Sequence, residues 1–114
     1  MISVLEEFSN VIVSYEIKTF RDYGVHYEFV AIARLKNNST LHIRDYRFRN
    51  GERKYSYHWQ TNDKRLIVRW DNANHHRQLG TFPFHKHIEN NVEESQPMTI
   101  RKVLEFISKE ISRK

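Results

Sequence analysis

The stretch TLHIRDYRFRNGERKYSYHWQ, residues 40–60, contains the strongest turn signal in the chain and decides the fold. Its Asn50-Gly51 pair is typical of a tight β-hairpin, because both residue types tolerate the left-handed backbone that such a turn requires. The second half, YSYHWQ, alternates aromatic with polar side chains, which is the period of a half-buried strand. We therefore predict two antiparallel strands, 40–48 and 53–60, with Tyr57 and Trp59 in the core.

The same two-residue period extends the sheet on both sides of this hairpin. Short turns between consecutive strands favour an antiparallel meander over a parallel sheet. Further strands are expected at 11–18, 25–36 and 65–70, with a short sixth at 81–88 that Pro83 makes irregular or confines to an edge. The acidic segment 89–96 is expected to be a loop.

Helical spacing of apolar residues predicts a short helix over residues 1–9 and a longer amphipathic helix near the C-terminus. Thr99 or Ser95 is expected to cap the second helix. The predicted fold class is α+β: an antiparallel five- to six-stranded meander sheet with a short N-terminal helix and an amphipathic C-terminal helix. At 114 residues the chain is expected to form one domain, 1–114.

Composition narrows the class of protein. The chain has no cysteine, which excludes disulfides and thiolate zinc sites. It shows no apolar run long enough to span a bilayer and no signal-peptide pattern, so a soluble cytoplasmic protein is expected. With three glycines in all, it lacks a glycine-rich nucleotide-binding loop.

Positive charge is concentrated in the middle third of the chain. From Arg34 to Arg69 the sequence has ten Lys and Arg residues and three acidic residues, a net charge of +7, whereas the net charge of the whole chain is +5. Basic residues interleaved with aromatics suit phosphate contact and base stacking. The predicted RNA-binding residues are Arg44, Arg47, Arg49, Arg53 and Lys54. A solvated sheet face is the plainer interpretation of the same charges.

The segment RWDNANHHRQLGTFPFHKH, residues 69–87, holds four of the seven histidines. In an extended segment, the His85-Lys86-His87 order puts both imidazoles on one side, where they could share a metal. His75, His76 or Asp71 could complete such a set. A hydrogen-bonded network that pins the loop to the sheet is the structural alternative.

Acid–base chemistry without a metal is the other interpretation of this segment. Cleavage of RNA through its 2′-hydroxyl needs a base, an acid and a cation near the phosphate, and histidine with Arg or Lys supplies all three near neutral pH. The candidate catalytic residues are His58, Arg69, Asp71, His75, His76, His85, Lys86 and His87. No cofactor and no metal are predicted.

Three motifs in this order resemble the TumE-like toxin family of bacteria and archaea: YSYHWQ, RWDNANHH and TFPFHKH, followed by a loop and a C-terminal amphipathic helix. The resemblance covers most of the chain. It implies the toxin half of a two-gene toxin–antitoxin module, whose partner is a small helix-turn-helix antitoxin. The matched motif positions are His58, Gln60, Arg69, Asp71, Asn72, His75, His76, Phe82, Pro83, His85, Lys86 and His87.

The chain departs from the family pattern at two positions. Asn74 stands where the family commonly has Pro, and Phe84 where it has a polar residue or His. No catalytic or ligand role is therefore carried over to position 84.

The leading hypothesis is a cytoplasmic toxin that acts on RNA as a metal-independent ribonuclease, with RNA and an antitoxin as partners and no membrane association. A homo-oligomer is left open. A non-enzymatic module that binds nucleic acid or protein, and a metal-dependent hydrolase, are the alternatives.

Overall fold

The structure, a computed structural model, describes residues 1–113. These residues form two helices and seven strands: α1 (Ile2–Glu7), β1 (Ile12–Asp22), β2 (Tyr27–Leu35), β3 (Thr40–Arg47), β4 (Arg53–Gln60), β5 (Leu66–Asp71), β6 (His85–Ile88), β7 (Asn91–Glu94) and α2 (Ile100–Ser112). None of the helices in these residues is both long and apolar enough to cross a membrane.

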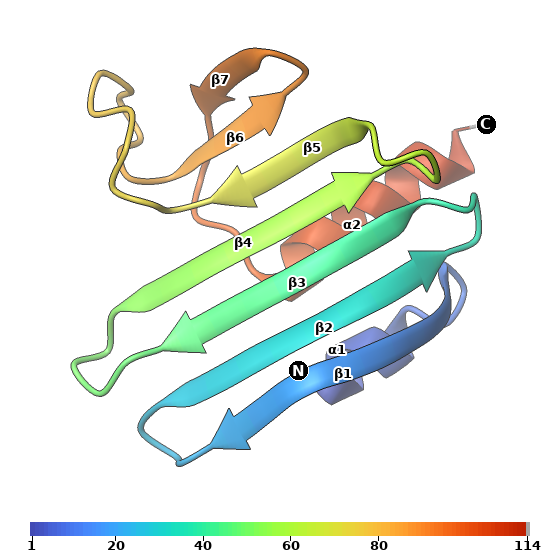
Figure 1. Cartoon of the computed structure of the whole chain (residues 1–114), viewed down its shortest axis with the longest axis horizontal. Coiled ribbons are helices and arrows are strands. Elements are labelled where there is room, and N and C mark those ends of the chain that lie inside the picture. The colour runs from blue at the N-terminus through green and yellow to red at the C-terminus, as the bar shows by residue number, and fades with distance from the viewer. Residues whose placement is uncertain (114) are drawn as a thin grey trace.

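The strands form one antiparallel sheet in sequence order, from β1 at one edge to β7 at the other (Figure 1). Each strand pairs with the next one in the chain, so the predicted α+β class and the meander are confirmed. The hairpin that decides the fold is present, with Arg47 opposite Arg53 and His42 opposite His58.

The predicted number of strands, five or six, is wrong. The acidic segment expected as a loop contains β7, which pairs with β6 through the two-residue turn Glu89-Asn90. Glu89 takes a positive φ of 54°, a position where glycine is the usual signal in such turns. Backbone pairing with β6 does not require apolar side chains, so the acidic composition of β7 conceals the strand. Pro83 lies ahead of β6, whose first residue is His85.

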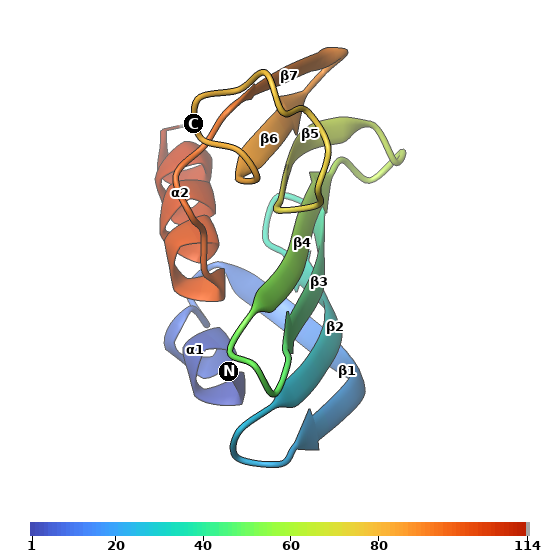
Figure 2. The ribbon, with the colours of Figure 1, turned by 90° about the vertical axis from the view of Figure 1, so that its left-hand side faces the viewer.

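Both helices lie on the same face of the sheet (Figure 2). The core lies between α2 and the inward side chains of the central strands, where Ile43, Tyr57 and Leu104 are fully buried. The prediction of Tyr57 and Trp59 as core residues is confirmed. The Thr99 hydroxyl accepts a hydrogen bond from the Lys102 amide at 3.2 Å, so Thr99 is the cap of α2.

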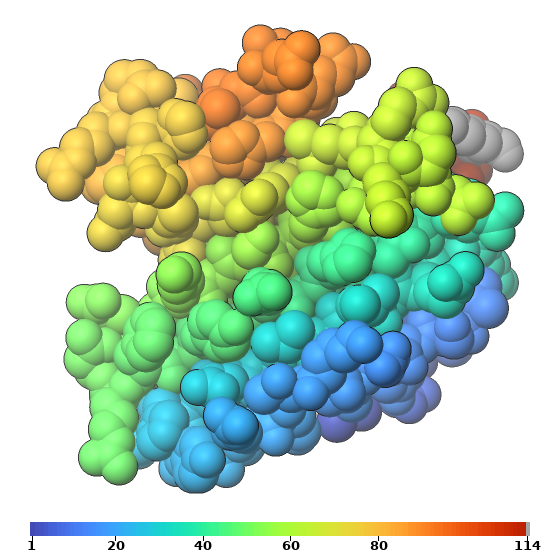
Figure 3. Space-filling model, viewed as in Figure 1, coloured from blue at the N-terminus to red at the C-terminus, as the bar shows by residue number. Residues whose placement is uncertain are grey.

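The opposite side of the sheet is covered by neither α1 nor α2, and we call it the open face (Figure 3). Because side chains alternate along a strand, most polar residues of β3 and β4 point to this face, while their neighbours, which are mainly apolar, point to the helices. The sheet therefore presents a polar surface built on a rigid support.

Candidate functional site

Four side chains form a row across the open face. His42 on β3 lies opposite His58 on β4. His58 lies opposite Arg69 on β5, and Arg69 lies opposite His87 on β6. Neighbouring strands are about 4.8 Å apart, so adjacent members of the row can contact one bound group. The row runs into two different environments, a shallow pocket on β3–β5 and a buried cluster beside β6.

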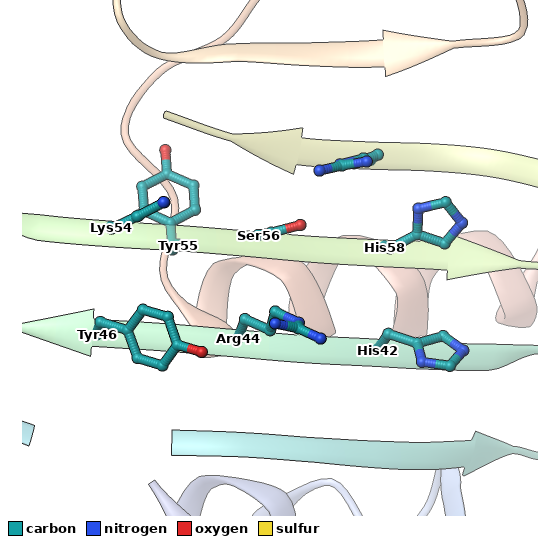
Figure 4. Close-up of a pocket in the computed structure, with 8 residues that line it drawn as sticks. His42, Arg44, Tyr46, Lys54, Tyr55, Ser56 and His58 are labelled. Atoms are coloured by element: carbon teal, nitrogen blue, oxygen red, sulfur yellow. The ribbon is translucent and has the colours of Figure 1, made fainter. Parts of the chain in front are cut away.

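The pocket, which we call the open-face pocket, has a volume of about 360 Å³. It is lined by His42, Arg44, Tyr46, Lys54, Tyr55, Ser56, His58 and Arg69. The two imidazoles lie at one end, Arg44 and Ser56 in the middle, and Tyr46 with Lys54 at the other end (Figure 4). The ring centroids of His42 and His58 are 6.1 Å apart, and the rings are nearly perpendicular.

Burial and neighbouring cations favour the neutral form of both pocket imidazoles. Burial lowers the pKa of His42, and the positive charge of Arg44 lowers it further. Burial also lowers the pKa of His58, with Arg69 and then His42 adding to the effect. Each imidazole can therefore accept a proton near neutral pH, and an anion bound between the arginines would favour the protonated form.

The second environment is the histidine cluster, which consists of Asp71, His76, His85 and His87. Asp71 is buried at its centre. One carboxylate oxygen lies 2.8 Å from His85 Nε2, and the other lies 3.3 Å from His87 Nε2. The Arg69 Nε atom is 3.3 Å from the same carboxylate, which links the cluster to the open-face pocket.

The imidazoles of the cluster converge from a loop and a strand. Centroid distances are 5.0 Å for His76–His85, 5.7 Å for His76–His87 and 5.0 Å for His85–His87. His85 is 2% exposed, and its Nδ1 donates to the Pro83 carbonyl at 2.8 Å, which leaves Nε2 directed toward Asp71. One nitrogen from each histidine falls within 4.8 Å of the others.

Local structure explains how the loop reaches this place. Asn72 follows β5 directly, and its amide side chain accepts from the Tyr55 amide and donates to the Arg53 carbonyl. These bonds attach the start of the loop to β4. His76 then adopts a positive φ of 60°, uncommon for a residue with a side chain, and its ring lies against His85.

Two residues predicted for the site lie on the helix-covered face. Arg53 contacts the buried Asp45 carboxylate at 3.1 Å and donates to the Met98 carbonyl. Lys86 alternates with the two histidines of its strand and lies in a cavity with Trp70 and Phe106. Neither side chain can reach a ligand bound in the open-face pocket, so we leave both out of the proposed site.

Some of the remaining predicted residues line the open-face pocket, and others are exposed outside it. Arg44, Lys54, His58 and Arg69 line the open-face pocket. Arg47 and Arg49 are exposed near the β3–β4 turn, and His75 is exposed beside the cluster. His75 is thus close in sequence to the cluster while His76 alone of the pair joins it.

Sequence reasoning missed His42, a single histidine with no motif around it. The hairpin could have found it: with Arg47 opposite Arg53, counting back five residues on one strand and forward five on the other places His42 opposite His58.

The whole chain, residues 1–114, matches the family described as Toxin TumE. The chain belongs to the TumE toxin family. Its membership confirms the resemblance seen in the three motifs, and it implies an antitoxin partner. No curated protein and no solved structure matches the chain.

Proposed function

We propose that this member of the TumE family acts on RNA and cleaves it in the open-face pocket by acid–base catalysis. The observation that carries the proposal is the juxtaposition of His42 and His58, with ring centroids 6.1 Å apart, in a pocket that Arg44 and Arg69 also line. A proton acceptor, a proton donor and two cations then surround the position of one phosphodiester.

The charge and shape of the pocket support a nucleic-acid substrate. Arg44, Lys54 and Arg69 put three cations around one depression of the open face. Guanidinium groups bind phosphate oxygens with two parallel hydrogen bonds, which positions the group as well as holding it. Tyr46 at the end of the pocket offers a ring for base stacking.

The chemistry of the pocket favours RNA over DNA. Two imidazoles can drive transesterification only if the substrate carries its own nucleophile, and the 2′-hydroxyl of RNA is that nucleophile. One neutral imidazole takes the 2′-hydroxyl proton as the bond from O2′ to phosphorus forms. The protonated imidazole gives its proton to O5′ as the phosphorus–O5′ bond breaks. The products are a 2′,3′-cyclic phosphate and a free 5′-hydroxyl.

Arg44 and Arg69 stabilise the extra negative charge that develops on the non-bridging oxygens in this step. The proton count balances. Before the step the imidazole that acts as acid carries the extra proton, and after the step the imidazole that acted as base carries it. The proposed reaction therefore requires no metal ion. His42 and His58 exchange roles when the cyclic phosphate is hydrolysed.

A basic open face also offers a surface for the antitoxin. We propose that an acidic surface of a helix-turn-helix antitoxin covers the open-face pocket and competes with RNA for Arg44 and Arg69. The helix-turn-helix class comes from the family resemblance, and the position of the contact comes from the charge of the face.

The experiment is cleavage of a long mixed RNA by the purified protein in the presence of a chelator. Wild type should cleave it and leave 2′,3′-cyclic phosphate ends, while His58→Ala should not. His75→Ala is the matched control, since it removes an exposed imidazole outside the pocket. Equal activity in all three proteins would overturn the proposed site, and no cleavage by folded wild type would overturn the reaction.

A further inference from the structure

We propose that the histidine cluster binds a divalent transition-metal ion of the Zn²⁺ type, with His76, His85 and His87 as ligands and Asp71 as the fourth. This site lies beside the open-face pocket and takes no part in the acid–base step above. It is therefore independent of the proposed function.

The ligand atoms already converge. One nitrogen of each imidazole lies within 4.8 Å of the other two. The Asp71 oxygens lie 2.8 Å and 3.3 Å from the Nε2 atoms of His85 and His87. Around a tetrahedral zinc ion with bonds of about 2.0–2.1 Å, ligand atoms are roughly 3.3 Å apart. The carboxylate and the β6 imidazoles thus need to move only slightly to bind a zinc ion, and His76 on the loop must move further.

The orientation of His85 is the one that metal ligands adopt. Its Nδ1 donates to the Pro83 carbonyl, so Nε2 is the nitrogen left for a metal, and metal binding would release the proton that Nε2 shares with Asp71, 2.8 Å away. A histidine that ligates a metal through one ring nitrogen usually donates the N–H of the other to a carboxylate, a backbone carbonyl or water, and this hydrogen bond fixes the ring orientation. The ring is 2% exposed and cannot turn toward solvent.

The donor atoms of the cluster also suit a transition-metal ion, with Arg69 as a second partner of the carboxylate. The buried Asp71 carboxylate contacts His85 and His87, and His76 lies against both of their rings. Imidazoles are neutral when they act as ligands. A divalent ion would be held by one negative charge and three strong nitrogen donors, a set that suits zinc better than calcium or magnesium. Four protein ligands make a closed site, which is the form that structural zinc takes.

The ion would join three segments. Asp71 ends β5, His85 and His87 belong to β6, and His76 lies in the loop between them. Asn72 already attaches the start of that loop to β4. A metal at the cluster would attach its middle, so the bound ion should stabilise the loop against the sheet.

The test is zinc binding to the purified full-length chain, measured by competition with a chromophoric chelator and by thermal unfolding. We expect one Zn²⁺ per chain and a higher Tm with zinc than with chelator. His76→Ala should weaken the affinity by more than about tenfold and remove the shift in Tm, since losing a ligand costs more affinity than losing a group that only orients a ligand. His76 is a half-buried loop residue, so this variant should remain folded.

The matched control is His75→Ala, which removes the neighbouring exposed imidazole and should bind zinc as wild type does. His42→Ala should also bind normally, because His42 lies in the open-face pocket. Absence of tight zinc binding by wild type would overturn the proposal. Loss of binding in His75→Ala or His42→Ala, with His76→Ala unaffected, would overturn it equally. Because the readout is metal binding, the result is separate from whether RNA is cleaved.

Discussion

The molecule has two groups of histidines that differ in how the backbone spaces them. In the open-face pocket, His42 and His58 project from adjacent regular strands, and their separation of 6.1 Å follows from the sheet. In the histidine cluster, His76 reaches in from a loop to meet His85 and His87 at 5.0–5.7 Å around a buried carboxylate. Side chains held apart on a sheet leave room for a substrate, whereas converging side chains leave room only for an ion.

The two groups of histidines also differ in the charges beside them. The pocket imidazoles face cations, Arg44 and Arg69, which disfavour protonation and attract phosphate. In the cluster, His85 and His87 contact Asp71, an anion. The same residue type is thereby directed toward acid–base chemistry in one place and toward holding a cation in the other.

The largest difference should appear in catalysis. Removing either pocket imidazole, by His42→Ala or His58→Ala, should lower the rate of RNA cleavage by about 10²–10⁴-fold, the usual contribution of a general acid or base. His76→Ala should leave the rate in chelator within a few-fold of wild type. The measurement is single-turnover cleavage of one defined RNA, and comparable losses in all three variants would break the distinction between the two groups.

The free energy of unfolding should depend more on the histidine cluster than on exposed charges. Asp71→Ala removes the buried partner of His85, His87 and Arg69, and it should lower the free energy of unfolding by about 3 kcal/mol or more, as expected when one member of a buried ion pair is lost. Asp63→Ala is the control, because its pair with Arg65 is exposed to solvent and its loss should cost far less. Urea unfolding measures both, and a similar small effect for the two would mean that Asp71 does not hold the cluster together.

The pH dependence should sharpen the assignment of His42. This imidazole faces Arg44 on its own strand, His58 on β4 and the apolar Ile32 on β2. Arg44 lowers the pKa of His42, so Arg44→Ala should raise that pKa. The limb of the kcat/KM profile that reports His42 then moves to higher pH, whether His42 is the base or the acid. Burial is the larger cause of the lowered pKa, so the pKa of His42 should stay below its ordinary value in Arg44→Ala.

Arg49→Ala is the control for this shift, since Arg49 carries the same charge in the exposed β3–β4 turn. Its profile should overlay that of wild type. An equal shift in both variants would indicate a general effect of net charge instead of a contact in the pocket.

The smallest effect should be on the salt dependence of RNA binding. Losing one phosphate contact lowers the slope of log affinity against log salt by about 1. We expect this change for Arg44→Ala and none for Arg53→Ala, whose guanidinium is held by Asp45 on the helix-covered face. Equal slopes for the two variants would place RNA elsewhere than in the open-face pocket.

Local signals in the sequence were sufficient for most of the fold. Alternation located the central strands, and Asn50-Gly51 located the hairpin on which the pocket is built. The strand β7 escaped because it is acidic and its turn has Glu89 where glycine is the usual signal. A strand held mainly by backbone hydrogen bonds does not need the alternating apolar side chains by which strands are predicted from sequence.

The candidate site was predictable where it depends on strand period and not where it depends on loop conformation. Period two puts His85 and His87 together and sends Lys86 to the other face. That His76 joins them and His75 does not depends on one left-handed residue in the loop, for which the sequence offers no glycine. The position of His42 was accessible only through the register of the hairpin.

The most direct measurement of the central claim is cleavage of one mixed RNA, in chelator, by wild type, His58→Ala and His76→Ala side by side. The account predicts 2′,3′-cyclic phosphate ends from wild type and His76→Ala and none from His58→Ala. Cleavage that stops in chelator and returns with zinc, or that is lost in His76→Ala and retained in His58→Ala, would place the reaction in the histidine cluster and contradict the account.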